Sequence, residues 1–312
     1  MKIYHTYIIH NQPPTFLELL VQLISVCNHK HVNPDVPFVF VTDNKSLDFY
    51  RGTGLLDLYD EVRTDIFDDY PYDRVSNTFW ATPKLWLMSK IQTPFLIIDT
   101  DLILNTPLRE FQNNQMVYLH RELQSGYLRP SEVTTPPLWE WNGDKKYYKQ
   151  SLPINVSVLY FNHQEFKDFY LKYYFDFVLD NSGEFINQDG DYIDKTSMQT
   201  FAEQYLLSAM ALKYQKEVDN NFKIKSLSDT VHAYGHYYNQ GDFDNPQDSS
   251  LGDYIFHLWG AKIFIDNPSH PFYQEAYNTV TMRGEEYLRE IGYWDRVSNL
   301  FISFRNQLPK PV

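Results

Sequence analysis

The strongest candidate for chemistry is a pair of aspartates, Asp99 and Asp101, which come directly after four apolar residues at 95–98. An apolar run of this length, bounded downstream by Asn105 and Pro107, is typical of a buried strand. Carboxylates are seldom buried unless something compensates for their charge. Two carboxylates one residue apart can reach one divalent cation, and oxygen ligands suit Mg²⁺ or Mn²⁺. We therefore expect the pair to bind a metal at the end of a strand, or else to face water as turn residues that cap backbone amides.

The composition restricts the class of protein. The chain has 312 residues, a formal net charge of −13, a single cysteine and 17% aromatic residues. This length can bury a large core, as one large domain or as one domain with a sizeable insertion. The negative charge argues against nonspecific binding to nucleic acid or to anionic membranes, so a phosphate-bearing ligand would need local cations or a metal. Tyrosine and tryptophan, with an apolar face and a polar tip, suit sugar rings and interfaces, although a compositional bias explains them equally well.

We expect neither a signal peptide nor a membrane-spanning segment. The apolar patch near the N-terminus is broken by His10 and two prolines. No stretch approaches the roughly 18 apolar residues of a spanning helix. The single Cys27 excludes an internal disulfide and a cysteine-based zinc site. A cytoplasmic protein is the simplest interpretation.

The elements before the aspartates predict a sheet that positions them. Strand patterns at 2–9 and 37–44 alternate with helix patterns that begin at Thr15 and Thr82. Thr15 starts a capping box with Glu18, and Thr82 is the expected cap of the second helix because a proline follows it. Strands and helices that alternate through short links predict a mostly parallel sheet covered by helices. Ligands of such sheets bind at the carboxyl ends of the strands, where the aspartate pair falls.

The rest of the chain contains an irregular segment and a second series of elements. Residues 120–153 contain four prolines, two glycines and clustered aromatics, which predicts a loop or small subdomain over the site. A strand pattern at 154–162 is followed by two helix patterns, the second of which begins at Ser197. A strand-like segment ends near His257, and the chain from about residue 272 has a helical pattern.

Four segments together resemble GT-A-fold glycosyltransferases that use nucleotide sugars. FLIIDTD resembles their metal-binding Asp-x-Asp. INVSVLYFN is similar to a strand that lines the sugar pocket in the retaining group related to glycogenin and bacterial lipopolysaccharide galactosyltransferases. FAEQYLL resembles the start of their Asp-Gln helix, and YIFHLWGAK resembles their late His-x-x-Gly-x-x-Lys segment. The segments occur in the order that the family has.

This resemblance implies an α/β fold of the GT-A, Rossmann-like type: a mixed, mostly parallel sheet flanked by helices, with an irregular insertion at about 120–153 over the active site. It implies a catalytic domain over residues 1–265, with 266–312 as a C-terminal helical extension of the same domain.

The resemblance also implies roles for individual residues. Asp99, Asp101 and His257 are the expected ligands of Mn²⁺ or Mg²⁺. Glu203 and Gln204 are expected near the anomeric carbon as catalytic residues. The expected contacts to the donor are spread along the chain: Thr6, Tyr7, Thr42, Asp43, Lys84, Thr100, Asn155, Gly260 and Lys262. Four aromatic residues of the insertion could stack on an acceptor sugar or pack the insertion onto the domain: Trp139, Trp141, Tyr147 and Tyr148.

Three positions depart from the family's pattern. The late segment is His-x-x-Gly-x-Lys, so Lys262 comes one residue early. Ser157 replaces the strand glycine and alters how closely a sugar can approach. Glu203 stands where the family has an aspartate, and its longer side chain changes its reach.

The implied reaction is metal-dependent transfer of a sugar from a nucleotide-diphosphate donor, a UDP-sugar in this resemblance, to a hydroxyl of a glycan or another acceptor, with retention. Two alternatives remain open. One is a haloacid-dehalogenase-like phosphatase with Asp99 as nucleophile and Asp101 as general acid, although Ile103 stands where that family has threonine or valine. The other is a non-catalytic carbohydrate-binding protein of the same fold.

Overall fold

The structure is a computed structural model. It describes residues 1–9, 13–121, 147, 150–179, 199–227, 255–257 and 267–310, with the backbone alone described at 255–257 and 272. The chain divides into two compact units. The first unit comprises Met1–Asp65, Ile97–Phe111 and His236–Val312, and the second comprises Ile66–Leu96 and Gln112–Gly235.

Three short strands form a parallel sheet in the first unit. They are β1 (Lys2–Thr6), β2 (Phe38–Val41) and β3 (Glu61–Arg63), and β2 pairs in parallel with both neighbours. The register places Thr6 opposite Val41 and Val41 opposite Arg63. The carboxyl ends of the three strands therefore lie at one edge, where parallel sheets bind ligands.

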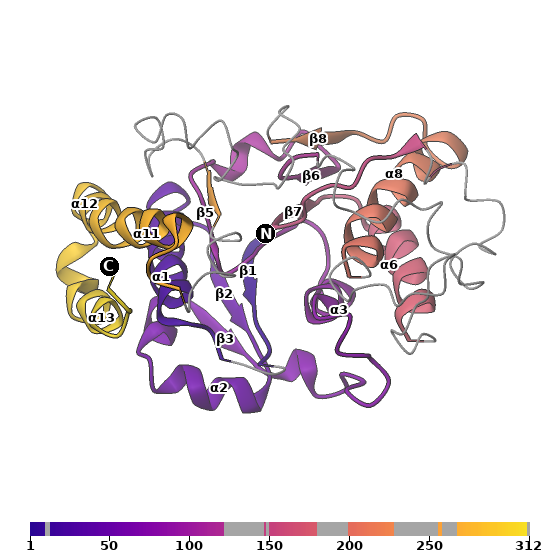
Figure 1. Ribbon diagram of the computed structural model, residues 1–312. Coiled ribbons are helices and arrows are strands. Elements are labelled where there is room, and N and C mark those ends of the chain that lie inside the picture. Colours follow the sequence, from indigo (N-terminus) through magenta and orange to yellow (C-terminus); the bar gives the residue numbers. More distant parts are fainter. Residues whose placement is uncertain are drawn as a thin grey trace. The chain divides into compact units, whose positions relative to one another are not determined.

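The helix α1 (Phe16–Val32) is the central helix of the first unit. The predicted capping box is confirmed: Thr15 Oγ1 accepts a hydrogen bond from the Glu18 amide, and Glu18 Oε2 accepts one from the Thr15 amide. The helical pattern of the tail is confirmed by three helices in this unit: α11 (Pro271–Asn278), α12 (Gly284–Glu290) and α13 (Trp294–Asn306). Of these, α12 and α13 pack on α1 (Figure 1). A π-helical turn, Thr279–Arg283, joins the first two of these.

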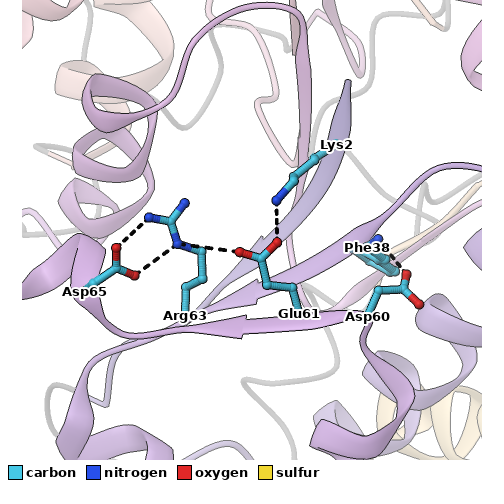
Figure 2. A network of polar contacts seen from close by, with 6 residues as sticks. All are labelled: Lys2, Phe38, Asp60, Glu61, Arg63 and Asp65. Atoms are coloured by element: carbon cyan, nitrogen blue, oxygen red, sulfur yellow. Dashed lines mark hydrogen bonds and ion pairs between the residues drawn. The ribbon is translucent and has the colours of Figure 1, made fainter.

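A network of charged side chains lies along the edge strand β3 (Figure 2). Arg63 forms two hydrogen bonds with Asp65, at 3.0 and 2.6 Å, and lies 3.8 Å from Glu61. Glu61 also pairs with Lys2 of β1. Exposed pairs of this kind each contribute little to stability. Charges on an edge strand do, however, oppose pairing with other chains.

Two buried histidines of the first unit stay neutral. His5 and His29 are 0% and 1% exposed. His5 Nδ1 shares a hydrogen bond of 2.8 Å with the Tyr59 hydroxyl, whereas neither ring nitrogen of His29 has a partner among the described residues. Burial lowers the pKa of His29 from 6.5 to about 3, and it also lowers the pKa of His5.

We expect this burial to make the protein less stable in acid. In the unfolded state His29 binds a proton below about pH 6.5, whereas in the folded state it does so only below about pH 3. The free energy of unfolding therefore falls as the pH drops from 6.5 to 3. Between pH 7.5 and pH 5 this residue should cost about 2 kcal/mol of unfolding free energy. Urea denaturation at both pH values measures the loss. His29→Leu should remove this part of the pH dependence of the unfolding free energy, while substitution of the exposed His31 should not. The same pH dependence in wild type and His29→Leu would show that His29 does not cause the loss.

The second unit contains a mixed group of strands. β6 (Met116–Tyr118) pairs antiparallel with β7 (Val158–Phe161) and parallel with β8 (Ile224–Ser226). The carboxyl ends of β6 and β8 therefore lie at the same edge as the amino end of β7. β4 (Phe95–Ile98), buried at all four positions, crosses from the second unit into the first.

The described residues of the second unit include three helices and a π-helical turn. They are α3 (Thr82–Lys90), α6 (Gln164–Val178) and α8 (Leu206–Glu217), and the π-helical turn Phe201–Tyr205 leads directly into α8. α6 packs on both α3 and α8. Thr82 is not the cap of α3, contrary to prediction: the cap is Ala81, and the Thr82 hydroxyl instead donates to the Phe79 carbonyl at 2.7 Å.

The described residues also contain 3₁₀ turns at Leu55–Leu58, Asp65–Phe67 and Leu108–Glu110. Most strand pairs of the described residues are parallel and helices flank them, so the predicted fold class, a mixed and mostly parallel sheet flanked by helices, is confirmed. Within the described part of the chain, each helix is too short or too polar to cross a lipid bilayer.

Candidate functional site

The aspartate pair lies in the turn between β4 and β5 (Leu102–Leu104), in the first unit. The Leu102 amide donates to the Asp99 carbonyl at 3.1 Å and closes the turn. Asp101 is 5% exposed, and Asp99 is half-buried. The Asp101 carboxylate lies close enough to His5 of β1 to oppose the effect of burial on the pKa of that histidine. A nearly buried carboxylate in such a turn fits a site for a cation.

His257 joins this turn through strand pairing. β9 (Ile255–His257) pairs antiparallel with β5 and places His257 opposite Leu102. Opposed residues have Cα atoms about 4.5–5.5 Å apart, so the Cα atoms of Asp101 and His257 lie within about 9 Å. The backbone thus brings the three predicted ligands to one end of a two-stranded ribbon.

Two carboxylates and an imidazole are a donor set that suits Mn²⁺ and, less well, Mg²⁺. Among the side chains that the structure describes, no three His, Cys, Asp or Glu residues are placed to hold a metal, and the His257 side chain lies outside that set. The metal site therefore stays a prediction that the backbone register favours.

Asn28 of α1 holds β5 in place. Its Nδ2 donates to the Leu104 carbonyl at 2.7 Å, and the Tyr287 hydroxyl of α12 donates to its Oδ1. Five residues further along the chain, Asn33 Oδ1 accepts from the Leu108 amide at 2.8 Å. Two side-chain amides of α1 and its C-terminus thus fix the segment that follows the aspartate turn.

We expect Asn28→Leu to destabilise the protein strongly. The substitution leaves the Leu104 carbonyl and the Tyr287 hydroxyl without their partner, and each buried group left unpaired costs about 1–3 kcal/mol. Urea denaturation should show a loss of at least about 2 kcal/mol. Asn113→Leu, at an exposed position, should change stability by less than about 0.5 kcal/mol. Equal midpoints for the two variants would mean that Asn28 does not anchor β5.

The predicted donor contacts of the first unit gather at the carboxyl ends of β1 and β2. The Thr42 hydroxyl donates to the Tyr7 carbonyl at 2.5 Å. Asp43 Oδ1 accepts from the Ser46 amide at 2.8 Å and so caps α2 (Asn44–Arg51). Thr6 Oγ1 is buried with no hydrogen-bond partner among the described residues. The structure brings the four residues together, and their contact with a nucleotide stays a prediction.

A buried ion pair forms the core of the candidate site in the second unit. Lys84 Nζ lies 2.8 Å from Glu203 Oε1, and the two side chains are 8% and 9% exposed. Lys84 Nζ also donates to the Val156 carbonyl at 3.2 Å, and Gln199 Nε2 donates to Glu203 Oε2 at 3.3 Å. Burying an ion pair is weak evidence for stability, so a role in function is the stronger hypothesis.

Asn155 and Gln204 adjoin this pair. Asn155 is 4% exposed, and its Oδ1 accepts from the Ser157 amide at 3.0 Å just before β7 begins. Gln204, in the π-helical turn, has a buried Oε1 with no hydrogen-bond partner among the described residues. Such an acceptor could take a hydrogen bond from a ligand hydroxyl.

The other predicted site residues lie apart or outside the described chain. Thr100 is half-buried in the aspartate turn. Tyr147 is 2% exposed, and its hydroxyl donates to Glu217 of α8, so it packs within the second unit. The remaining predicted residues lie outside the described residues: Trp139, Trp141, Tyr148, Gly260 and Lys262.

Sequence reasoning missed two partners of the ion pair. Gln199 lies four residues before Glu203, and helix spacing could have identified it as a neighbour. The Val156 carbonyl has no sequence signal, because any residue type supplies a carbonyl.

The sequence matches the Family of unknown function (DUF6734) over residues 22–262. The chain belongs to this family. A comparison with curated proteins finds no match to this DUF6734 sequence.

Solved structures similar to this DUF6734 chain include several glycosyltransferases. The apo form of the glycosyltransferase GlyE of Streptococcus pneumoniae TIGR4 matches over 99% of the chain and 64% of its own length, with 12% identity and a TM-score of 0.42. An active-site mutant of LgtC matches over 94% of the chain and 95% of its own length, with 12% identity and a TM-score of 0.41. Mouse xyloside xylosyltransferase 1, in its apo form, matches over 82% of the chain and 96% of its own length, with 13% identity and a TM-score of 0.37.

The DUF6734 chain therefore spans about 64% of the length of GlyE.

Proposed function

We propose that this DUF6734 chain is a metal-dependent glycosyltransferase. It moves a sugar from a nucleotide-diphosphate donor, UDP-linked in our proposal, to a hydroxyl of a glycan or another acceptor, with retention at the anomeric carbon. The observation that carries the proposal is the pairing of β5 with β9, which sets His257 opposite the residue that follows Asp101. Two aspartates that merely cap a turn give no reason for a histidine to be held across from them.

In this proposal the first unit holds the metal. Asp99, Asp101 and His257 would bind Mn²⁺ or Mg²⁺, which would supply positive charge to the departing diphosphate. Thr6 and Tyr7 would contact the nucleotide from the edge of the parallel strands.

The second unit supplies the sugar contacts in this proposal. Breaking the bond between sugar and phosphate develops positive charge on the ring, and the Glu203 carboxylate would stabilise that charge. Lys84 Nζ, 2.8 Å from Glu203 Oε1, would orient the carboxylate and balance its charge. Gln204 Oε1 would accept a hydrogen bond from a sugar hydroxyl, and Asn155 would contact the ring. With retention, the leaving phosphate takes the proton of the attacking hydroxyl, so no dedicated base is required.

Release of nucleoside diphosphate tests this function. The purified chain is incubated with a panel of nucleotide sugars, with Mn²⁺ or with a chelator, and products are separated by chromatography. We expect one donor to be consumed only when the metal is present. Metal-dependent hydrolysis of a model phosphate ester, with all donors intact, would support the phosphatase alternative instead. Donor binding without turnover across an acceptor panel would support the carbohydrate-binding alternative.

A further inference from the structure

The second unit contains a cavity of about 690 Å³ between β6, β8 and α8. Cavities that bind small molecules typically enclose about 300–1,000 Å³. The buried residues Met116 and Tyr118 of β6 line it, and so do Ser208 and Leu212 of α8. The cavity is thus large enough for one or two sugar rings.

The cavity lies next to the proposed sugar contacts. Ile154, which lines it, directly precedes Asn155. Ser208 follows Gln204 by four residues, about one helical turn or 6 Å along the helix. Because β6 and β8 are parallel and β7 is antiparallel to β6, Tyr118 lies at the same edge of the strands as Asn155. A molecule in the cavity would therefore lie beside the sugar of a donor held by Gln204 and Asn155.

The described residues that line the cavity carry the charge opposite to that of the chain. The chain has 40 acidic and 27 basic residues, yet none of the described residues that line the cavity is acidic. Arg121 and Lys225 both line it, and both are exposed at its rim. Neither forms an ion pair with any described residue.

Arg121 is oriented to bind an anion. Its Nε donates to the Tyr118 hydroxyl at 3.1 Å, and its two Nη groups form no hydrogen bond with any described residue. A guanidinium held at Nε presents the fork that binds a carboxylate or phosphate through two parallel hydrogen bonds. The Ser208 hydroxyl lines the cavity and suits a ligand hydroxyl. Gln150 and Gln215 also line it, and each has one amide atom in a protein hydrogen bond: Gln150 Oε1 accepts from Lys216 Nζ at 2.7 Å, and Gln215 Nε2 donates to the Phe222 carbonyl at 2.9 Å. The Gln150 Nε2 and the Gln215 Oε1 suit ligand hydroxyls.

From this cavity we propose that the acceptor is an acidic saccharide, a sugar that carries a carboxylate or a phosphate. Its anion would bind Arg121 and Lys225, and its hydroxyls would bind the amide and serine side chains. That the bound saccharide is the acceptor rests on the proposed glycosyl transfer. The binding itself does not depend on transfer.

Titration by ligand-observed NMR tests the binding directly. The probes are methyl glucuronide, glucose 6-phosphate, methyl glucoside and inorganic phosphate. We expect at least one acidic sugar to bind about tenfold more tightly than methyl glucoside, and more tightly than phosphate alone. Whichever of the two acidic sugars binds more tightly shows whether the cavity prefers a carboxylate or a phosphate. Equal binding of the neutral and acidic sugars, or binding of phosphate as tight as that of glucose 6-phosphate, would overturn the proposal.

Matched variants locate the binding. Arg121→Gln and Lys225→Gln should each weaken the binding of the acidic sugar by about tenfold. Lys223→Gln makes the same change of charge two residues away on an exposed position that does not line the cavity, and should leave the affinity unchanged. Unaltered affinity in both cavity variants would place the sugar elsewhere and reject the proposal.

The same titration separates this inference from the proposed function. Binding of an acidic sugar by a chain that consumes no donor would refute the transferase while the cavity assignment stands. Transfer to neutral acceptors, with no binding of acidic sugars, would refute the acidic acceptor while the transferase stands.

Discussion

Lys84→Met is expected to lose both folding stability and sugar transfer. The substitution leaves the Glu203 carboxylate as an unpaired charge in a site where both side chains are less than 10% exposed, at 8% and 9%. Removing one partner of a buried ion pair typically costs about 3–5 kcal/mol. Urea denaturation measures the stability, and donor consumption measures the transfer. Lys84 also loses its hydrogen bond to the Val156 carbonyl, which adds to the effect.

A double variant separates the two losses. Lys84→Met with Glu203→Met replaces the whole pair by apolar side chains, and it should regain most of the lost stability while remaining inactive. Lys90→Met is the matched control on the same helix. Its partner Asp69 lies 2.5 Å away with its side chain 65% exposed, so that substitution should change stability little. A double variant that transfers sugar at the wild-type rate would show that the pair takes no part in the reaction.

Asp101→Asn is expected to abolish most metal-dependent turnover and leave the fold intact. The substitution keeps the shape of the side chain and removes the negative charge that the proposed ion requires. Losing one electrostatic contact to a transition state typically lowers turnover by about 100- to 1,000-fold. The rate of donor consumption is measured against Mn²⁺ concentration for wild type and variant. Asp35→Asn, at an exposed position of the same unit, should behave as wild type. Turnover of Asp101→Asn within twofold of wild type would exclude the residue as a metal ligand.

Local patterns predicted the elements that position the site. The capping box of Thr15 and Glu18 marks the start of α1, because its two hydrogen bonds depend only on residues three apart. The buried run before Asp99 likewise predicts β4 from its own composition. Thr82 was misplaced as a cap because its hydroxyl bonds to the Phe79 carbonyl, a contact that depends on how the preceding turn folds.

Contacts between distant residues could not be predicted in the same way. Lys84 and Glu203 were each predicted near the donor, but their ion pair depends on how α3 and the π-helical turn meet. The cavity beside α8 has no sequence signal at all, since its lining comes from short pieces of several elements. The resemblance to a known family proposed His257 as a ligand, and only the register of β5 and β9 gives that assignment a physical basis.

Thermal unfolding with nucleotide sugars, in the presence and absence of Mn²⁺, tests the metal site most directly. A ligand that binds only the folded state raises the midpoint by mass action. We expect one nucleotide sugar to raise the unfolding midpoint of the wild type only when Mn²⁺ is present. Asp101→Asn and His257→Ala should lose this shift, while their midpoints without ligand should stay close to that of the wild type. A shift of equal size without metal, or one that both variants retain, would contradict this expectation.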